Sequence, residues 1–321
     1  MALLACALAR SAIAQTIPDT ATKPLDNVDK QWFTGSLEAS SPALSKAGAF
    51  ALEPYFILEG HTGAYDANGH HHSIAHDSSL VESVIVMKYG ITNRLTIQAL
   101  PTFLRAWTDQ AHSHGSGVAD LPVELEYRFL DENNHSGAPS VTFSLGITAP
   151  IGDYQNLRNP IDGVGAGAFT LKQGIVVQAL FPTWGDHPVR LRLFGAAYEP
   201  IADVGLHGQS VYGTAPGFFG RAKPGIAAEA GLAGGWALNQ SWVFAIDVVE
   251  NYAAGARLIG TDESEGFVLT SRVRSFTTSV APAVEYNWSA RAGLIFGVDF
   301  TVAGQNSSSY VAPQIAFAFS F

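Results

Sequence analysis

Apolar and polar residues alternate with a period of two along most of this chain. Between residues 121 and 129 the odd positions are all apolar, and the even positions include Glu124, Glu126 and Arg128. Successive side chains of a strand point to opposite faces, so this period predicts β-strands with one apolar and one polar face. Residues 94–103 and 141–148 repeat the pattern.

Twelve such stretches of about ten residues follow one another from Phe50 onward, which is the length that a tilted strand needs to cross a bilayer. They lie near residues 50–60, 80–89, 94–104, 119–129, 140–149, 166–180, 189–199, 225–236, 241–251, 274–287, 290–302 and 310–321. The chain from 49 to 321 is therefore predicted to be all-β.

The connections between these stretches alternate in length. Short or middle-sized turns fall at 91–93, 130–139, 181–188, 238–241 and 287–290. Long polar loops fall between them, at 61–79, 105–118, 150–165, 200–224 and 252–273. Short turns on one side and long loops on the other are typical of outer-membrane barrels, whose short turns are periplasmic. The alternation predicts a transmembrane, antiparallel, up-and-down β-barrel with both termini on the periplasmic side.

Alternation alone does not distinguish a membrane barrel from a soluble β-sandwich, because either fold has one apolar face. Aromatic residues favour the barrel, since amphipathic rings collect at the membrane–water boundary. They gather where strands meet the predicted periplasmic turns, at Tyr89, Tyr127, Phe129, Trp184, Trp236, Trp242, Tyr286 and Trp288.

The chain ends on a strand of strict alternation, with phenylalanine at 317, 319 and 321. This ending resembles the C-terminal strand of bacterial outer-membrane barrels, in which a terminal phenylalanine is part of the assembly signal. The resemblance implies that the barrel-assembly machinery is a partner. The location it implies makes outer-membrane lipid and lipopolysaccharide partners as well.

Composition narrows the functional classes. Charged residues make up 14% of the chain, and no apolar run reaches the length of a membrane helix. The net charge of −10 argues against nucleic acid as a partner, because phosphate binding needs a basic surface. The only cysteine, Cys6, lies in the N-terminal segment, so neither a disulfide framework nor thiol catalysis is expected.

The N-terminal residues predict export. Residues 1–14 contain an apolar stretch and the small-residue site Ala12-Ile13-Ala14, which predict a signal peptide cleaved after Ala14. A lipoprotein cleavage box at Leu3–Cys6 is the alternative. Residues 15–48 show little periodicity and predict an extended periplasmic or lumenal segment, anchored by Trp32 and Phe33.

The stretch Tyr89-Gly90-Ile91-Thr92-Asn93-Arg94-Leu95, with Pro101, 121–130 and Gly146–Asp153, resembles a known family. It is the outer-membrane transporter family named for the meta-pathway of phenol degradation. The resemblance implies a channel barrel in the outer membrane of a Gram-negative bacterium, for passive passage of small molecules that include apolar or aromatic compounds. Asn93 stands where aspartate is common, and either residue supports the turn.

Charged side chains on the polar faces are the first candidate site residues, because charges inside a barrel need water or partners. The predicted lumen-lining charges are Glu53, Glu82, Lys88, Glu124, Glu126, Arg128, Lys172, Arg190, Arg192, Glu229, Asp247, Glu285 and Asp299. Their acidic excess favours a narrow, slightly cation-selective pore. A lumen closed by salt bridges is the alternative.

Histidines cluster in two predicted extracellular loops. His61, His70, His71, His72 and His76 fall in the first, and His112 and His114 in the second. Imidazole and carboxylate groups are ligands for Zn²⁺ or Cu²⁺, so His70, His71, His72, His76, His112 and His114 are candidate metal ligands. A structural or binding barrel that captures a divalent metal or a partner is therefore the alternative function. A plain hydrophilic tract, or loops that close with pH, would give the same composition.

An outer-membrane lipase is the third hypothesis, because His76-Asp77-Ser78 resembles a His-x-Ser catalytic pair. A serine nucleophile needs a base and an orienting group, and no convincing third partner follows in the sequence. We therefore expect no enzymatic activity and no cofactor.

Overall fold

The computed structural model describes residues 30–321 apart from 134–137, 182–186 and 265. The predicted signal peptide, 1–14, and Trp184 lie outside this part of the chain and stay predictions. Among the described residues, no helix is long and apolar enough to cross a membrane.

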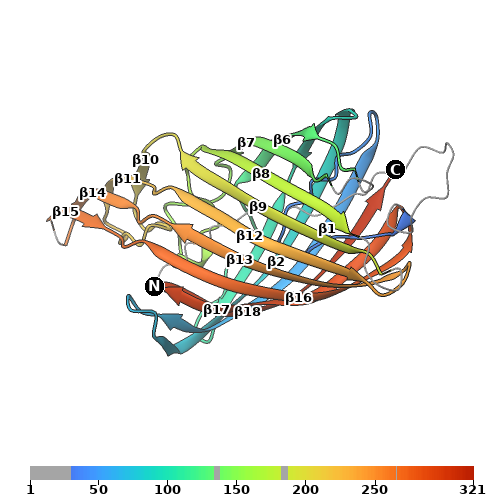
Figure 1. The fold of residues 1–321 in the computed structure, drawn as a ribbon. Coiled ribbons are helices and arrows are strands. Elements are labelled where there is room, and N and C mark those ends of the chain that lie inside the picture. The colour runs from blue at the N-terminus through green and yellow to red at the C-terminus, as the bar shows by residue number, and fades with distance from the viewer. Residues whose placement is uncertain (1–29, 134–137, 182–186, 265) are drawn as a thin grey trace.

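The described chain forms a closed, antiparallel barrel of twelve strands (Figure 1). The first six are β1 (Phe50–Tyr65), β2 (His71–Thr92), the interrupted pair β3 (Leu95–Ala99) and β4 (Thr102–Thr108), β6 (Leu121–Leu130), β7 (Ser140–Ala149) and β8 (Thr170–Phe181). The others are β9 (Val189–Pro200), β12 (Ala227–Ala237), β13 (Trp242–Ala253), β16 (Ser275–Ser289), β17 (Ala292–Gln305) and β18 (Ser307–Ser320). The predicted fold class is confirmed.

Closure joins the first strand to the last. β1 pairs with β2 along one edge and with β18 along the other, where Tyr55 lies opposite Ala316. The terminal Phe321 donates its backbone N–H to the Phe50 carbonyl at 2.8 Å. A closed ring leaves no unpaired strand edge, which a strand in lipid could not tolerate.

One predicted strand, 94–104, is interrupted. The chain breaks between β3 and β4 at Leu100 and Pro101, and β4 then pairs with the two-residue strand β5 (Gly117–Val118) instead of β6. Proline lacks the N–H that a central strand must donate, so the break falls at Pro101. β2 crosses the break and holds both pieces in the wall.

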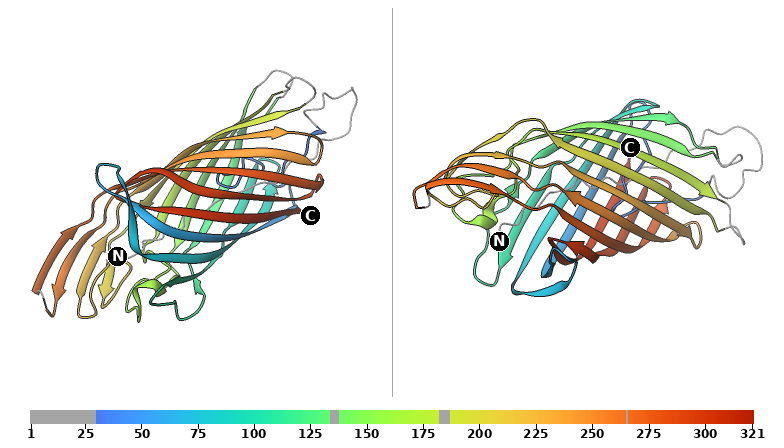
Figure 2. Two further views of the ribbon diagram at one scale, coloured as in Figure 1. Left: turned by 90° about the horizontal axis from the view of Figure 1, so that it is seen from below. Right: turned by 60° about the vertical axis from the view of Figure 1, so that its left-hand side comes forward.

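Two predicted long loops are strands instead. Within 200–224 lie β10 (Val204–His207) and β11 (Phe219–Lys223), and within 252–273 lie β14 (Arg257–Asp262) and β15 (Gly266–Ser271). They form a four-stranded sheet that extends one side of the barrel beyond the end opposite the C-terminus (Figures 1 and 2). The prediction failed because lipid does not dictate the outer face here. One face of the sheet packs on a core that includes Val204, Leu206 and Leu258, but the other mixes exposed charged and apolar side chains, so no strict alternation marks these strands.

The predicted loop 61–79 is wrong for the same reason. β1 continues to Tyr65 and β2 starts at His71, so the connection is a tight hairpin around Asp66. His61, expected in a loop, is a buried residue of β1. Ser78, expected at a strand boundary, lies inside β2 opposite His61 and Thr108.

The outward face of the barrel is apolar and aromatic. Its exposed side chains include Leu58, Leu193, Leu232, Phe244 and Phe296. At the end where the C-terminus lies, Tyr286 contacts both Trp242 and Trp288, with ring centroids 4.7 and 6.3 Å apart. Apolar side chains between aromatic girdles are what a lipid-facing barrel surface needs.

Candidate functional site

The N-terminal segment 31–47 lies inside the barrel. The Gln31 side chain donates to the Asn239 carbonyl in the turn between β12 and β13 at 2.9 Å. The backbone N–H of Ala47 donates to the Asn93 side chain, in the turn between β2 and β3, at 3.1 Å. Both turns are at the periplasmic end, so the segment enters the lumen there, bends and returns to the same end before β1 begins.

Carboxylates on the inner wall bind the ascending half of the segment. Glu285 accepts the Thr34 N–H at 2.6 Å. Asp247 accepts the Ser36 hydroxyl and the Glu38 N–H, both at 2.8 Å. These are hydrogen bonds to charged acceptors, the stronger class of protein hydrogen bonds.

The descending half is held by the opposite wall. The Pro42 carbonyl accepts from the Arg128 guanidinium and from the Thr142 hydroxyl. A Cβ atom on Gly90 would lie 1.9 Å from the Lys46 carbonyl oxygen, so only glycine lets this strand pass so close to the segment. Residues from strands far apart in the sequence thus hold the segment through hydrogen bonds and a close backbone contact.

The predicted lumen-lining charges all lie on the inner face, and their role in permeation stays a prediction. Ten of the thirteen are buried, and Glu82, Arg128 and Glu229 are partly exposed. Three ion pairs join wall strands that are not adjacent in the sheet: Lys172–Glu124 between β8 and β6 at 2.7 Å, Lys88–Glu126 between β2 and β6 at 3.4 Å, and Arg190–Glu285 between β9 and β16 at 2.8 Å. In addition, Arg192 donates to Gln178, and the Tyr198 and Tyr310 hydroxyls donate to Glu229 and Asp299. We call the inner face of β6–β9, with these pairs, the charged wall.

The inner face also carries an apolar strip that the sequence did not reveal. We call it the apolar wall; its large members are Tyr55, Ile57, Val84, Val86, Leu100 and Ile295, with Leu37 of the N-terminal segment packed on them. In β1 the outward Phe56 and Leu58 flank Ile57, so both faces are apolar and a period of two gives no contrast. Leu37 fits there because Gly297 has no side chain: a Cβ atom would lie 2.6 Å from Leu37 Cδ1.

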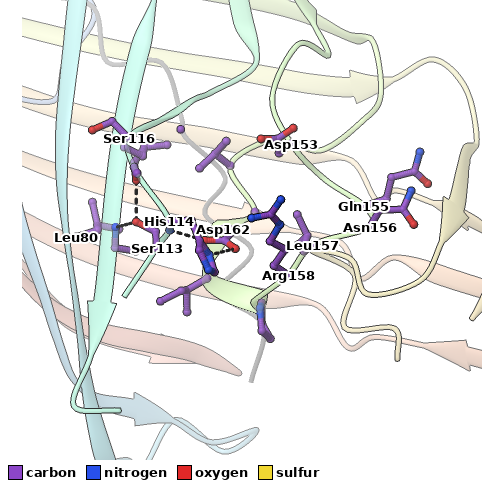
Figure 3. Close-up of a pocket in the computed structure, with 18 residues that line it drawn as sticks. Leu80, Ser113, His114, Ser116, Asp153, Gln155, Asn156, Leu157, Arg158 and Asp162 are labelled. Carbon is purple, nitrogen blue, oxygen red and sulfur yellow. Dashed lines mark hydrogen bonds and ion pairs between the residues drawn. The ribbon is translucent and has the colours of Figure 1, made fainter. Parts of the chain in front are cut away.

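A cavity of about 360 Å³ lies above the apolar wall, between the 109–118 loop and the 150–165 loop (Figure 3). Its apolar lining includes Leu80, Leu104, Leu157, Ile161 and Val164, and its polar lining includes His114, Asp153, Arg158 and Asp162. Leu80 and Val84 are both buried on the inner face of β2, with Glu82 between them. The inner face of one strand therefore runs from the cavity to the apolar wall.

Hydrogen bonds fasten the two loops around this cavity. The His114 N–H and ring reach the two Asp162 oxygens at 2.9 and 2.8 Å (Figure 3). Partial burial disfavours the charged carboxylate, but the hydrogen bonds from His114 outweigh it and lower the pKa of Asp162. Asp120 accepts the N–H groups of Gly152 and Ala166 at 2.9 and 2.7 Å, which ties the second loop to the barrel.

The predicted metal ligands do not come together as one site. His70 and His72 lie 3.3 and 3.4 Å from Asp66, whose pKa is lowered to about 2, first by the His70 N–H and further by the two rings. His71 packs on Tyr65, His112 is exposed beside Trp107, and His114 pairs with Asp162. The described residues hold no group of three or more side chains suited to a metal. The structure does not describe the side chain of His76, so the metal and lipase hypotheses stay predictions.

Comparison with known proteins supports the assignment of the fold. No family model and no curated protein matches the sequence. The COG4313 outer membrane channel from Pseudomonas putida F1 is similar in structure, with a TM-score of 0.62 at 18% identity over 86% of this chain and 96% of that one. The transport unit of the autotransporter AIDA-I from Escherichia coli has a TM-score of 0.44 at 10% identity, over 85% and 90%. The first likeness and the closed ring show that the chain has the fold of an outer-membrane β-barrel.

Proposed function

We propose that this protein is an outer-membrane channel for passive passage of small molecules, and that its extracellular cavity receives the solute. The observation that carries the proposal is a strip of inner-face residues on β2 that leads from the cavity to the apolar wall. Leu80 lines the cavity, and Val84, four residues further along the same face of β2, belongs to the apolar wall. A passive channel needs a path from a mouth to an interior, and this strip marks the proposed course of that path.

Apolar or aromatic solutes fit this path. The lining is apolar on the side of β1, β2 and β17, and transfer of apolar surface out of water is favourable. The hydroxyl of Tyr55 in the apolar wall, together with nearby polar groups, would orient a solute that has a polar end. The charged wall carries fewer large apolar side chains, such as Val176 and Phe194, among its ion pairs.

The N-terminal segment blocks the path at the apolar wall, so passage requires its displacement. Leu37 fills the space between the wall strands, and hydrogen bonds to Glu285, Asp247 and Arg128 hold its neighbours. Hydrogen bonds and packing can break and reform without unfolding the barrel. The segment therefore acts as the gate of the proposed channel.

The Gram-negative outer membrane supplies the other partners of the proposal. The exposed apolar surface would contact lipid and lipopolysaccharide, and β18, as the closing strand, would present the terminal phenylalanine to the barrel-assembly machinery. We expect no enzymatic activity.

Uptake into liposomes tests the proposed function. Wild-type protein is expected to admit a small aromatic solute slowly, and Asp247→Ala, which frees Ser36 and Glu38, is expected to admit it faster. Glu250→Ala changes a carboxylate on the outer face of the same strand and should match wild type. No uptake and no planar-bilayer conductance with any of the three proteins would refute the channel.

A further inference from the structure

Three basic residues crowd one outer face of the extracellular sheet. Lys223 of β11 lies directly opposite Arg257 of β14, and Arg221 lies two residues from Lys223 on the same face. All three side chains are exposed. Like charges directly opposite each other destabilise a sheet, so this arrangement is costly unless an anion lies against it. We call Arg221, Lys223 and Arg257 the basic platform.

Carboxylates of the protein neutralise little of the positive charge of the basic platform. Asp203 is the acidic neighbour, and it reaches Arg221 only at 3.9 Å with both side chains exposed. Within the described part of the chain, no ion pair is formed by Lys223 or Arg257. In a protein with a net charge of −10, an unneutralised basic cluster is a local exception.

The level of the platform relative to the membrane follows from the aromatic residues. Along β16, Tyr286 in the periplasmic girdle and Phe276 are ten residues apart. That is about 33 Å of strand, which the usual tilt reduces to about 25 Å, the height of a lipid-facing band. Phe276 packs on Tyr252 at 5.0 Å and so marks the outer boundary. The platform lies just beyond it, four residues outward from the Ala227–Ala253 pair.

The surface around the platform is amphipathic. Ile259 lies opposite Arg221 on the same face, and Leu269 lies opposite Ile259; both are exposed. Below it, the Arg274 guanidinium lies 5.9 Å from the Phe276 ring, at the level of the boundary. An exposed face that joins apolar and cationic side chains and continues the lipid-facing wall suits an anionic lipid.

We propose that the basic platform binds the phosphate groups of lipopolysaccharide. The occupant follows from three observations: the charge of the platform, its level just outside the hydrocarbon, and its continuity with the lipid-facing surface of β12, β13 and β16. Arginine and lysine both bind phosphate, arginine in a bidentate manner. The lipid anchors one side of the extracellular sheet and relieves the repulsion between Lys223 and Arg257.

Titration of detergent-solubilised, folded protein with phosphorylated rough lipopolysaccharide tests the proposal. Lys223→Gln/Arg257→Gln should weaken binding about 30-fold, since each basic group near an anionic lipid surface contributes about fivefold. Without lipopolysaccharide, the same variant should melt at or above the wild-type temperature, because the repulsion is gone. Lys46→Gln/Arg291→Gln removes two exposed charges at the opposite end of the barrel and should bind like wild type.

A charge-preserving variant and a dephosphorylated lipid test whether binding depends on the basic charges and on phosphate. Lys223→Arg/Arg257→Lys keeps both charges and should retain affinity within about threefold, which excludes a folding defect as the cause. Dephosphorylated lipopolysaccharide should bind wild type as weakly as the glutamine variant binds the intact lipid. Equal affinity of wild type and glutamine variant, or equal binding of the intact and the dephosphorylated lipid by wild type, would overturn the proposal.

This inference rests on the outer-membrane location in the proposed function but not on permeation. The glutamine variant should therefore keep wild-type conductance in planar bilayers. Absence of conductance in every protein, with phosphate-dependent lipid binding intact, would refute the channel and leave the basic platform standing.

Discussion

The two walls of the lumen hold the N-terminal segment by different physics. The charged wall pairs its own side chains across strands and binds the segment through Arg128 and Thr142. The apolar wall packs on Leu37 without a hydrogen bond to that side chain. A polar contact is directional and costly to leave unmade, whereas an apolar contact accepts any apolar surface of suitable size. The apolar wall can therefore exchange Leu37 for a solute, and the charged wall positions the gate.

The largest expected effect comes from breaking the buried ion pair next to the gate. Glu285→Ala leaves the buried Arg190 without its carboxylate and the Thr34 N–H without its acceptor. We expect a loss of about 3–5 kcal/mol in the free energy of unfolding, measured by urea titration in phospholipid vesicles. Glu250→Ala, on the outer face, is the control and should change it by no more than about 0.5 kcal/mol. A loss below about 1 kcal/mol for Glu285→Ala would show that water already solvates this pair.

Removal of the apolar contact made by Leu37 should lower the stability less than Glu285→Ala does, and its main effect should be on transport. Leu37→Ala deletes a side chain that is 1% exposed, at an expected cost of about 2–3 kcal/mol. It also weakens the gate, so uptake of an aromatic solute into liposomes should rise. Leu58→Ala, on the lipid-facing side of β1, should leave uptake unchanged. Equal uptake by all three proteins would contradict the role of Leu37.

Polar substitutions in the apolar wall should change selectivity. Ile57→Thr and Val84→Thr keep the branched shape but replace a methyl or ethyl group with a hydroxyl. Loss of one buried carbon at Val84 and of two at Ile57, at about 0.8 kcal/mol each, should lower the aromatic-to-polar uptake ratio about fourfold and about fifteenfold. Gln178→Ala, on the inner face of β8, serves as the control. A ratio that changes equally in all variants would mean that the two walls are equivalent to the solute.

The smallest expected effect is a pH dependence at the cavity mouth. The pKa of Asp162 is lower in the folded protein than in the unfolded chain, so its carboxylate stabilises the loop contact above about pH 4. That contribution is lost as the pH falls through the lowered pKa. Hydrogen exchange of 110–118 and 157–164, corrected for intrinsic rates, should increase at low pH in wild type. Asp162→Asn should show the faster exchange already at pH 7.

The sequence predicted those parts of the fold in which lipid imposes a pattern. Strands such as β6, with Leu125 outward and Glu124 inward, face lipid on one side and a polar interior on the other, so alternation reveals both strand and face. β10, β11, β14 and β15 lie outside lipid, and their exposed face mixes apolar side chains such as Ile259 with charges such as Arg257, so alternation does not reveal them. The apolar wall was missed because Ile57 and Phe56 are both apolar although they face opposite sides.

The candidate site was predictable to the same extent. Inward charges were found because a charged residue on a membrane strand has only the interior to face. Which of them would pair, and which would bind the N-terminal segment, depends on registers between distant strands. The pairing of His114 with Asp162 joins two loops 48 residues apart. No local pattern in either loop indicates it.

The central claim is that displacement of the N-terminal segment opens the channel, and a reversible lock tests it most directly. The Thr34 hydroxyl donates to the Asn287 side-chain oxygen at 2.8 Å, so Thr34→Cys/Asn287→Cys in a Cys6→Ser background places two thiols side by side for a reversible disulfide. Uptake of an aromatic solute into liposomes should be absent when the disulfide is oxidised and should return to the wild-type rate after reduction. The same uptake in both states would show that solutes pass without moving the segment, and would contradict the account.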